Sequence, residues 1–486
     1  MIIMNLATKT KLFLKNSSAQ AKASIAFLLA GVFQKGIQII TTPIYTRIMS
    51  TSQYGDYNTY NAWYNILSIF ISLRIAYGVY TQGLVKFEKD KDQFESSLMG
   101  LTVTLSAGSA IILFILKDIV IQYTELSLPL IMCIVLESTA ESFFALWARR
   151  ELVETRWKAL IIVSLLVSVL VPTVSIIAII YSNDKAIARI YSTVIIYLMV
   201  YSFVAFLHFK KSKVFFRRDY WKYSVWFCLP LIPHYLSQVV LNQADRIMIK
   251  SMCGSDKSGI YSLAYSLAMV MLIVNESINR TFDPWIMKQI KTKNYKDIAK
   301  YSYVLIVLVG AANLFLICLA PEAIAIFAPQ EYKEAIWVIP PVASSVFIMF
   351  LYNFFVDFEF YYEKRRGISI ASICGALLNI VLNWIFIKKY GFIAAGYTTL
   401  ICYIVYIIAH YCFMVNICKM ELNGIRVYNG KYIFMVVMLF LIIGLGTMLL
   451  YPYTLIRYFF VGVGIVALFF SKTKIIEIFK LVKKDD

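Results

Sequence analysis

The chain has 486 residues, of which 60% are hydrophobic and only 15% are charged, and its formal net charge is +19. Soluble globular domains contain roughly 45–50% apolar and about 25% charged residues, so this composition excludes a soluble protein and indicates a polytopic membrane protein. The Lys and Arg residues gather in loops between apolar runs, which favours membrane topology over nucleic-acid binding as the reason for the positive charge. We therefore expect no nucleic-acid partner.

Fourteen apolar runs follow one another along the chain. Most are long enough to cross a ~30 Å hydrocarbon core as a helix, so the sequence predicts an all-α protein with about 14 transmembrane helices. Most of the 47 Lys and Arg residues lie in every second loop, which predicts a multi-pass protein of the bacterial cytoplasmic (inner) membrane with both termini in the cytoplasm. The predicted spans are 23–46, 58–84, 96–116, 119–147, 159–181, 187–209, 224–249, 260–286, 301–320, 335–358, 367–387, 392–417, 432–450 and 454–471.

A short motif at the outer end of the first span recurs in the second half of the chain. Gly55-Asp-Tyr follows Arg47, and Gly259-Ile-Tyr follows Arg246. This repetition indicates two similar halves. The predicted organisation is a cytoplasmic N-terminal segment (1–22), two six-helix bundles (23–209 and 224–417) joined by a basic cytoplasmic linker (210–223), and two additional helices with a basic tail (418–486).

Three stretches resemble signatures of one transporter family. The turn Tyr45-Thr-Arg-Ile-Met-Ser…Tyr54-Gly-Asp-Tyr looks like the first-helix signature of bacterial polysaccharide flippases. Leu377-Leu-Asn-Ile-Val-Leu-Asn-Trp384, followed by Lys389-Tyr-Gly-Phe-Ile-Ala-Ala-Gly396, is similar to late helices of the same family. The chain is thereby identified as resembling the Wzx-type O-antigen or capsule repeat-unit transporters of the MOP exporter superfamily, over roughly residues 23–417.

The resemblance implies a fold, a cargo and partners. The fold would be two six-helix bundles around a central cavity that alternates between inward- and outward-open states. The cargo would be a polyprenyl diphosphate that carries a short oligosaccharide for O-antigen, capsule or exopolysaccharide synthesis. Partners would be this lipid, the bilayer and other polysaccharide-assembly membrane proteins. The expected protein is a transporter and not an enzyme, with no cofactor other than a coupling Na⁺ or H⁺ gradient.

Five basic residues within or near the ends of spans are the candidates for binding the diphosphate. Charges inside a bilayer are costly, so they are functional candidates by default. Arginine suits a diphosphate because its planar fork can donate to two oxygens at once. The alternative is that each pairs with a nearby acid, such as Arg280 with Glu276 or Asp283, or reaches an interface. The candidates are Lys35, Arg47, Arg74, Arg246 and Arg280.

A sodium site is a second candidate, and it rests on the resemblance alone. Lipid II flippases of the superfamily hold sodium between helices 7, 11 and 12. The matching positions here are Asp245, Asn379, Asn383 and Thr398. One carboxylate with amide and hydroxyl oxygens suits a hard monovalent cation better than a transition metal. Alternatively, the asparagines only join helix to helix.

Glu137 and Glu141 form an i, i+4 pair on one face of the predicted span 119–147. Two close carboxylates can share a proton or bind a cation, so they are candidates for ion coupling. They can equally balance Arg149 and Arg150, which follow on the same helix.

The other in-span titratable groups are expected to be structural. Asp357 and Glu359 precede Lys364, Arg365 and Arg366, which is typical of a charge-balanced helix end. His234 and His410 are more often packing residues than proton relays. The chain has no CxxC pair and only three histidines, so neither a disulfide framework nor a transition-metal site is indicated.

Two alternative functions remain open. A multidrug or cation antiporter of the same superfamily would favour an acidic cavity, whereas the basic residues within these spans favour an anionic cargo. A lipid-linked glycan polymerase would commonly carry a large external loop, and the sequence shows none. No Ser-His-Asp, HExxH or P-loop pattern stands out either.

Overall fold

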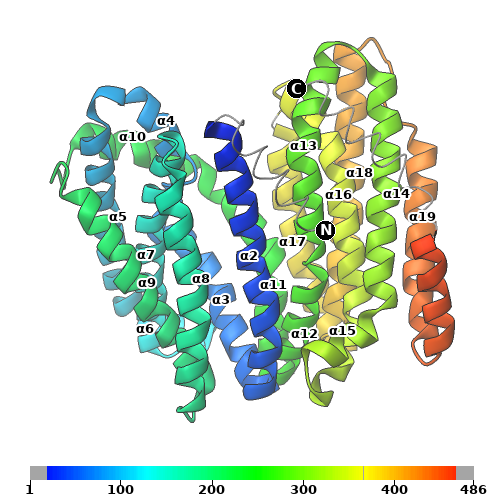
Figure 1. Cartoon of the computed structure of the whole chain (residues 1–486), viewed down its shortest axis with the longest axis horizontal. Coiled ribbons are helices and arrows are strands. Elements are labelled where there is room, and N and C mark those ends of the chain that lie inside the picture. The colour runs from blue at the N-terminus through cyan, green and yellow to red at the C-terminus, as the bar shows by residue number, and fades with distance from the viewer. Residues whose placement is uncertain (1–18, 365, 467–486) are drawn as a thin grey trace, which may run out of the picture. The chain divides into compact units, whose positions relative to one another are not determined.

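The computed structural model describes residues 19–364 and 366–466, and every regular element in these residues is a helix (Figure 1). Eleven helices in this part of the chain are long and apolar enough to cross a membrane. The three remaining predicted spans fall on α2 (Ala19–Ile48), on the polar helix α3 (Thr51–Ser72), and on the helix Thr454–Val466. The polytopic helical fold is confirmed, while the count of fourteen stays a prediction. Residues 1–18 and 467–486, which hold most of the predicted N-terminal segment and the basic tail, lie outside the described residues.

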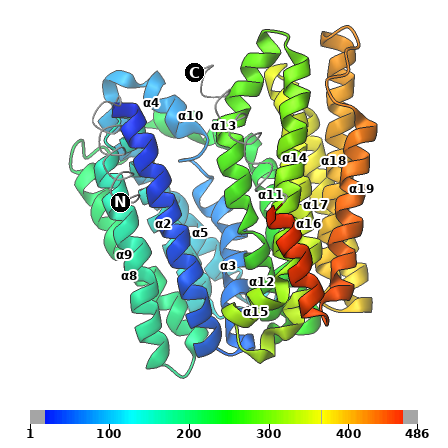
Figure 2. The same cartoon turned by 45° about the vertical axis from the view of Figure 1, so that its right-hand side comes forward.

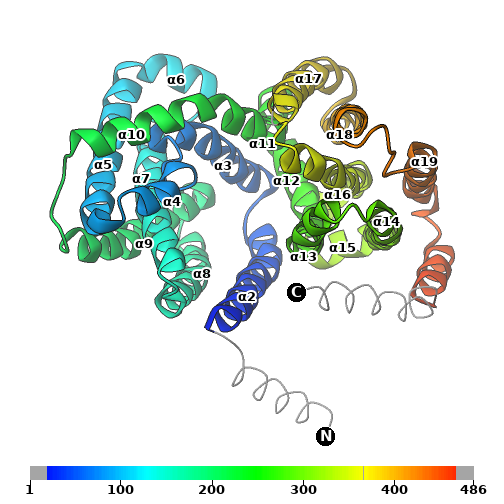
Figure 3. The same ribbon diagram turned by 90° about the horizontal axis from the view of Figure 1, so that it is seen from above.

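The chain divides into two units. The first contains residues 19–53 and 60–236, and the second contains residues 54–59 and 237–466 of the described chain. In the first unit α7 packs on α5 and α9, α8 packs on α9, and α2 packs on α8 (Figure 3). Its further helices are α4 (Val79–Lys86), η1 (Glu88–Asp90), α5 (Lys91–Ile115), α6 (Lys117–Thr124), α7 (Leu128–Val153), α8 (Trp157–Ile180), α9 (Lys185–Phe209), α10 (Arg218–Cys228) and η2 (Leu229–Leu231).

Helix α16 is the centre of the second unit. It packs on α12, α13, α14, α17, α18 and α19, and its apolar segment is mostly buried. Figures 2 and 3 show α19 at the edge of this unit, followed by the red helix Thr454–Val466. The helices are α11 (Ile232–Cys253), α12 (Ser255–Ala268), α13 (Met271–Lys291), α14 (Tyr295–Cys318), α15 (Ala320–Phe327), η3 (Gln330–Trp337), α16 (Ile339–Tyr361), α17 (Arg366–Tyr390), α18 (Ala394–Glu421), α19 (Gly430–Gly446) and η4 (Thr447–Leu450).

Helix α3 starts at a strong sequence signal and ends without one. Ser50 and Gln53 form a capping box in which each side chain accepts from the other's backbone N–H at 3.2 Å. The helix stops at Ser72, inside the predicted span 58–84, because Leu73 and Arg74 both adopt left-handed backbone angles with φ of 49°. The chain then turns through residues 73–78 before α4 begins. This span is therefore a broken helix.

The two repeated Gly-x-Tyr motifs lie against each other within the second unit. A Cβ atom on Gly55 would come within 2.0 Å of the Ser255 carbonyl oxygen and 2.8 Å of the Gly259 nitrogen. Beside it, the Ser255 hydroxyl donates to the Asp56 carboxylate at 2.7 Å, and Lys250 pairs with the same carboxylate at 2.8 Å. Glycine at position 55 therefore permits a backbone-to-backbone approach of the first turns of α3 and α12.

Candidate functional site

A small polar cavity of about 30 Å³ lies beside the break after α3, within the first unit. Its walls come from α3, from the turn 73–78, from α5 and from α7. Arg74 and Glu141 supply opposite charges to this lining. A cavity needs roughly 10–15 Å³ to hold a water molecule, so this space admits polar ligand atoms or water. Its hydroxyl groups come from Tyr64, Ser68, Ser72, Thr102, Ser138 and Ser142.

The Arg74 side chain is held in place by its unusual backbone and by one aromatic ring. The backbone N–H of Arg74 donates to the Ser72 hydroxyl at 3.2 Å, and the guanidinium carbon lies 5.4 Å from the centre of the Tyr77 ring. Its Nε is buried and has no hydrogen-bond partner among the described residues. A left-handed conformation at a non-glycine residue costs roughly 1–2 kcal/mol, and such strain persists where the surrounding structure enforces it.

A second arginine converges on the same ring. The guanidinium carbon of Arg149, at the end of α7, lies 5.6 Å from the Tyr77 ring centre. Tyr77 is 54% exposed, so two cations meet on an accessible aromatic surface. From the sequence, Arg149 was expected only as a possible partner of the glutamates on its helix. The helix break after α3, which places residues 74–77 beside α7, could not be predicted from the sequence.

The glutamate pair of α7 faces a tyrosine pair of α3. The Tyr60 hydroxyl donates to Glu137 at 2.8 Å, and the Tyr64 hydroxyl donates to Glu141 at 2.5 Å. Both pairs have i, i+4 spacing, so the two helices are joined by two parallel hydrogen bonds. Glu137 is buried, whereas Glu141 borders the polar cavity. The role of this pair in ion coupling stays a prediction.

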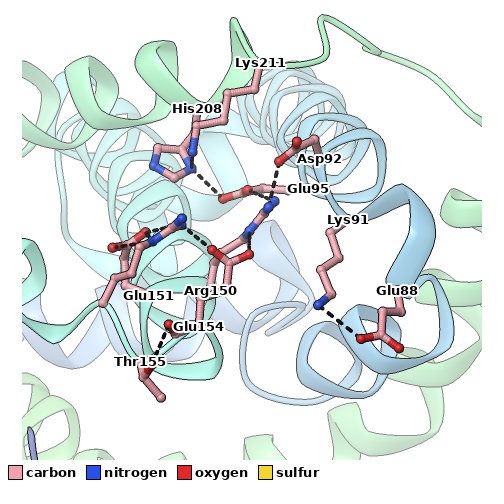
Figure 4. Close-up of polar contacts among 11 residues, drawn as sticks. Glu88, Lys91, Asp92, Glu95, Arg150, Glu151, Glu154, Thr155, His208 and Lys211 are labelled. Carbon is pink, nitrogen blue, oxygen red and sulfur yellow. Dashed lines mark hydrogen bonds and ion pairs between the residues drawn. The ribbon is translucent and has the colours of Figure 1, made fainter. Parts of the chain in front are cut away.

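Arg150 binds other carboxylates (Figure 4). Its Nη1 lies 2.6 Å from Glu95, its Nη2 lies 2.7 Å from Asp92, and its Nε donates to Glu154 at 2.8 Å. The imidazole of His208 lies 3.2 Å from the second oxygen of Glu95. The Arg150 and Glu95 side chains are almost wholly buried, and this cluster joins the ends of α5, α7 and α9. Arg150 therefore does not pair with Glu137 and Glu141, which accept hydrogen bonds from Tyr60 and Tyr64 instead.

The other basic candidates lie in varied surroundings. Lys35 and Arg47 are exposed on α2, where Arg47 donates to the carbonyl of Pro43 at 3.0 Å. In the second unit Arg246 donates to the side chain of Gln243 and lies 4.6 Å from the Tyr265 ring centre.

Arg280 is 3.7 Å from Glu276, and both side chains are mostly exposed. This is the pairing that the sequence analysis left open as an alternative. An exposed pair at this distance contributes about 0–1 kcal/mol, so it does not hold Arg280 firmly.

The four predicted sodium-site residues meet in the second unit around a buried carboxylate. Asp245 of α11 is 1% exposed. Its Oδ1 accepts from the Asn383 amide at 2.6 Å, and its Oδ2 accepts from the Tyr261 hydroxyl at 2.6 Å and the Thr399 hydroxyl at 2.8 Å. Tyr261 and Thr399 were not among the candidates. Tyr261 belongs to the repeated Gly-x-Tyr motif, which was a usable signal.

A second layer of hydrogen bonds holds the amide groups. The Thr398 hydroxyl donates to the Asn383 oxygen, and the Asn383 amide also donates to the Asn379 oxygen at 3.1 Å. All of these residues are buried. The donor set is a carboxylate with amide and hydroxyl oxygens, which fits a hard cation such as Na⁺. Every polar atom named here also has a protein partner, so the geometry equally fits a helix-joining network.

Glu359 has a partner that the sequence did not indicate. The side chains of Arg365 and Arg366, which were expected to balance its charge, lie outside the described part of the chain, so the charge-balanced helix end stays a prediction. Glu359 and His410 are both 0% exposed, and their Oε1 and Nδ1 atoms lie 2.5 Å apart. Lys364 pairs with Glu421 at 3.2 Å. The end of α16 faces α18 at this point, which places Glu359 beside a histidine that is distant in the sequence.

Comparisons with known proteins agree with this architecture. The family model described as "Polysaccharide biosynthesis protein" matches residues 21–289, and the model described as "MatE" matches residues 230–385. The "Lsg locus putative protein 1" of Haemophilus influenzae is 24% identical over 376 residues, which cover 74% of this chain and 89% of that protein.

Two solved structures share the fold. One is "Lipid II flippase MurJ, inward closed conformation", with a TM-score of 0.62, 15% identity, and coverage of 89% of this chain and 100% of that one. The other is an inward-facing multidrug resistance MATE family transporter of the MOP superfamily, with a TM-score of 0.61, 12% identity, and coverage of 80% and 96%.

Proposed function

The chain belongs to the polysaccharide biosynthesis protein family of the MOP transporter superfamily, and we propose that it flips a polyprenyl-diphosphate-linked oligosaccharide across the bacterial inner membrane. The lipid is taken from the cytoplasmic leaflet and released in the outer leaflet by alternating access. The saccharide then serves synthesis of O-antigen, capsule or a related polysaccharide, with other assembly proteins of the membrane as partners.

The observation that carries this proposal is the pair of guanidinium groups on Tyr77, at a broken helix that borders a polar cavity. Discontinuous helices are the usual place where transporters bind polar ligands inside a membrane. Arg74 and Arg149 together supply two cations for the two phosphates. The Arg74 Nε and the Ser138 hydroxyl, which are buried without a partner among the described residues, supply unused hydrogen-bond donors. Arg149 is thereby added to the candidates, while Lys35, Arg47, Arg246 and Arg280 remain as further cationic contacts.

Coupling to an ion gradient is the second part of the proposal. The Asp245 network has the oxygen donors for Na⁺, and the pair Glu137 and Glu141 has the spacing for a shared proton. Asp245→Asn keeps the shape of the side chain and removes its charge. We expect this variant to insert normally and to lose its response to the sodium gradient. Normal transport under every sodium and proton gradient tested would exclude a coupling role for Asp245.

The experiment that tests the cargo site is restoration of surface polysaccharide in a strain that lacks its own flippase. Losing a charge-assisted contact weakens capture about ten-fold or more, so Arg74→Ala/Arg149→Ala should abolish export at normal expression. Arg74→Lys, which keeps the charge without the fork, should be partly active. Arg189→Ala is a matched control, because Arg189 lies 3.5 Å over the Tyr45 ring in the same unit. A well-expressed double variant that restores surface polysaccharide would refute the site.

A multidrug or cation antiporter is the second candidate, because the MatE model matches residues 230–385 and two glutamates face α3. Vesicles that contain the purified protein distinguish the two functions. An antiporter would exchange a cationic dye for protons or sodium, and Glu137→Gln/Glu141→Gln would stop that exchange. A flippase would expose a lipid-linked saccharide to an external enzyme and leave the dye gradient unchanged.

The proposed orientation has its own test. Reporter fusions after Lys222 and after Lys300 should give a cytoplasmic signal, whereas a fusion after Lys257 should give an external one. The reason is the bias of basic residues toward the loops that contain the first two positions. A cytoplasmic signal at Lys257 would contradict the assignment of sides.

A further inference from the structure

A groove lies between α18 and α19, and the proposed transport cycle gives it no role. Its volume is about 830 Å³. Helix α19 packs on α14 and α16 rather than on α18, which leaves this space open between the two helices (Figure 3). The side chains on each wall recur at helical spacing, so they form two apolar stripes that face each other. The stripes include Ile404, Ile407 and Ile408 on α18 and Phe434, Val437 and Leu441 on α19.

One end of the groove is basic. Arg426 and Lys431 are exposed and line it, and no acidic side chain lines it among the described residues. The Tyr411 hydroxyl lies at the same end, where a Cβ on Gly430 would come within 2.2 Å of its oxygen. The Asn429 side chain already accepts from the N–H of Lys431 at 3.0 Å, so the positive charge at this end comes from side chains and not from the start of α19.

This combination selects its occupant. An apolar groove on a membrane-embedded surface favours a hydrocarbon chain over water. Beyond the basic end the walls are apolar, so a diphosphate with its sugars would lose its hydration there and gain no hydrogen-bond partner. The proposed cargo therefore cannot pass along this groove. A lipid that stays in one leaflet needs only a charged contact at the end and an apolar wall for its chain.

We propose that this groove binds one anionic glycerophospholipid of the leaflet at the predicted cytoplasmic face. An acyl chain lies between α18 and α19, and the phosphate lies beside Arg426 and Lys431. Two cations match a phosphodiester because each forms a charge-assisted contact with an oxygen that carries negative charge. The bound lipid connects α19 to α18 along the groove, beyond the contact between Gly430 and Tyr411 at its basic end.

Native mass spectrometry of the purified full chain tests this proposal with two probes, phosphatidylglycerol and phosphatidylcholine. Arg426→Ala/Lys431→Ala should weaken phosphatidylglycerol binding about ten-fold or more and leave phosphatidylcholine binding unchanged. Lys388→Ala/Lys389→Ala removes the same charge at the end of α17, outside the groove, and should keep the preference for phosphatidylglycerol. Unchanged phosphatidylglycerol binding in the Arg426→Ala/Lys431→Ala variant would overturn the proposal.

A second pair of variants tests the apolar part. Val437→Trp fills the groove and should weaken binding of both lipids. Met435→Trp adds the same ring to α19 at a position that is 57% exposed and does not line the groove, so it should bind as the original chain does. Lipid binding by Val437→Trp that equals that of the original chain would overturn the proposal. A cysteine at position 437 that crosslinks to a second copy of the chain or to a lipid-linked saccharide would also overturn it, because the groove would then have another occupant.

Discussion

The polar clusters around Asp245 and Arg74 differ in how completely their charges are satisfied. Both oxygens of Asp245 accept hydrogen bonds, and the three donors are at most 1% exposed. Arg74 has a strained backbone and a buried Nε with no partner among the described residues. It also borders a cavity and an exposed aromatic ring.

This difference separates two kinds of polar site in a membrane protein. A buried network in which every polar group is hydrogen-bonded keeps its helices together. Its hydrogen bonds rearrange only when a group as small as an ion or a proton enters the network. A cation with unused hydrogen-bonding capacity beside a cavity can contact an anionic group without losing existing bonds. The sequence alone treats both as ionisable residues within spans. This difference in surroundings is the reason why we propose Arg74 as a contact for the cargo and Asp245 as a ligand for an ion.

The largest effect is expected from Asp245→Ala. The change removes the buried acceptor of the Tyr261 and Thr399 hydroxyls and of one N–H of Asn383, whose amide still donates to Asn379, and each unsatisfied donor costs about 1–3 kcal/mol. We expect loss of correctly folded protein, measured by size-exclusion chromatography and thermal unfolding in detergent. Asp245→Asn should fold much better, because an amide oxygen can still accept from two donors. Equal stability of Asp245→Ala and the original chain would show that the network is not needed to hold the helices.

A smaller loss is expected where α3 meets α12. Gly55→Ala places a Cβ on the Ser255 carbonyl oxygen, and because backbone cannot move aside locally, the two helices must separate. Overpacking of this kind costs about 1–3 kcal/mol. The matched control is Gly108→Ala, which meets no atom within 4 Å and should keep or slightly raise the melting temperature. Equal melting temperatures for the two variants would contradict the close contact.

Two tyrosine variants sharpen the comparison directly. Tyr261→Phe removes a donor from the dry network, where no other group can replace it, and should destabilise the protein by about 1–2 kcal/mol. Tyr64→Phe removes the donor to Glu141 beside the cavity, where water and Arg74 can compensate, and should cost less than about 1 kcal/mol. Thermal unfolding of both variants checks the order. A larger loss for Tyr64→Phe would mean that the cavity side is the more rigid one.

The sequence predicted the fold class because hydropathy and the distribution of basic residues are local properties of the chain. The grouping of Asp245 with Asn379, Asn383 and Thr398 came from a resemblance, and the structure places all four together. Thr399 was missed because adjacent positions on α18 differ only in the direction of their side chains, which the sequence does not give.

Other features depended on contacts between distant elements. Arg74 lies at a helix break that has no glycine or proline at positions 73 and 74, so no turn signal marked it. Glu359 of α16 is close to basic residues in the sequence, but in space it pairs with His410 of α18, two helices later. In both cases tertiary packing overrode the local pattern.

The smallest loss of stability is expected for a substitution of Glu322 of α15, whose carboxylate pairs with Arg457 at the edge of the fold. Both of its oxygens accept from Arg457 at 2.7 Å, and these hydrogen bonds lower the pKa of the Glu322 carboxyl below its usual value. A carboxyl with a lowered pKa in the folded state stabilises the protein above the pKa of the unfolded chain. This stabilisation is lost as the pH falls through the folded pKa.

An amide oxygen can still accept from Arg457, so Glu322→Gln should cost only about 0.5 kcal/mol at pH 7. The cost should decrease as the pH falls below about 4, since the original side chain is then protonated as well. Thermal unfolding of both chains at several pH values measures the difference. Arg457 is only 2% exposed and retains an acceptor in the Cys318 carbonyl at 2.8 Å, which should keep the variant folded. A gap between the two melting temperatures that stays constant from pH 7 to pH 3 would mean that Glu322 contributes by packing and not by its charge.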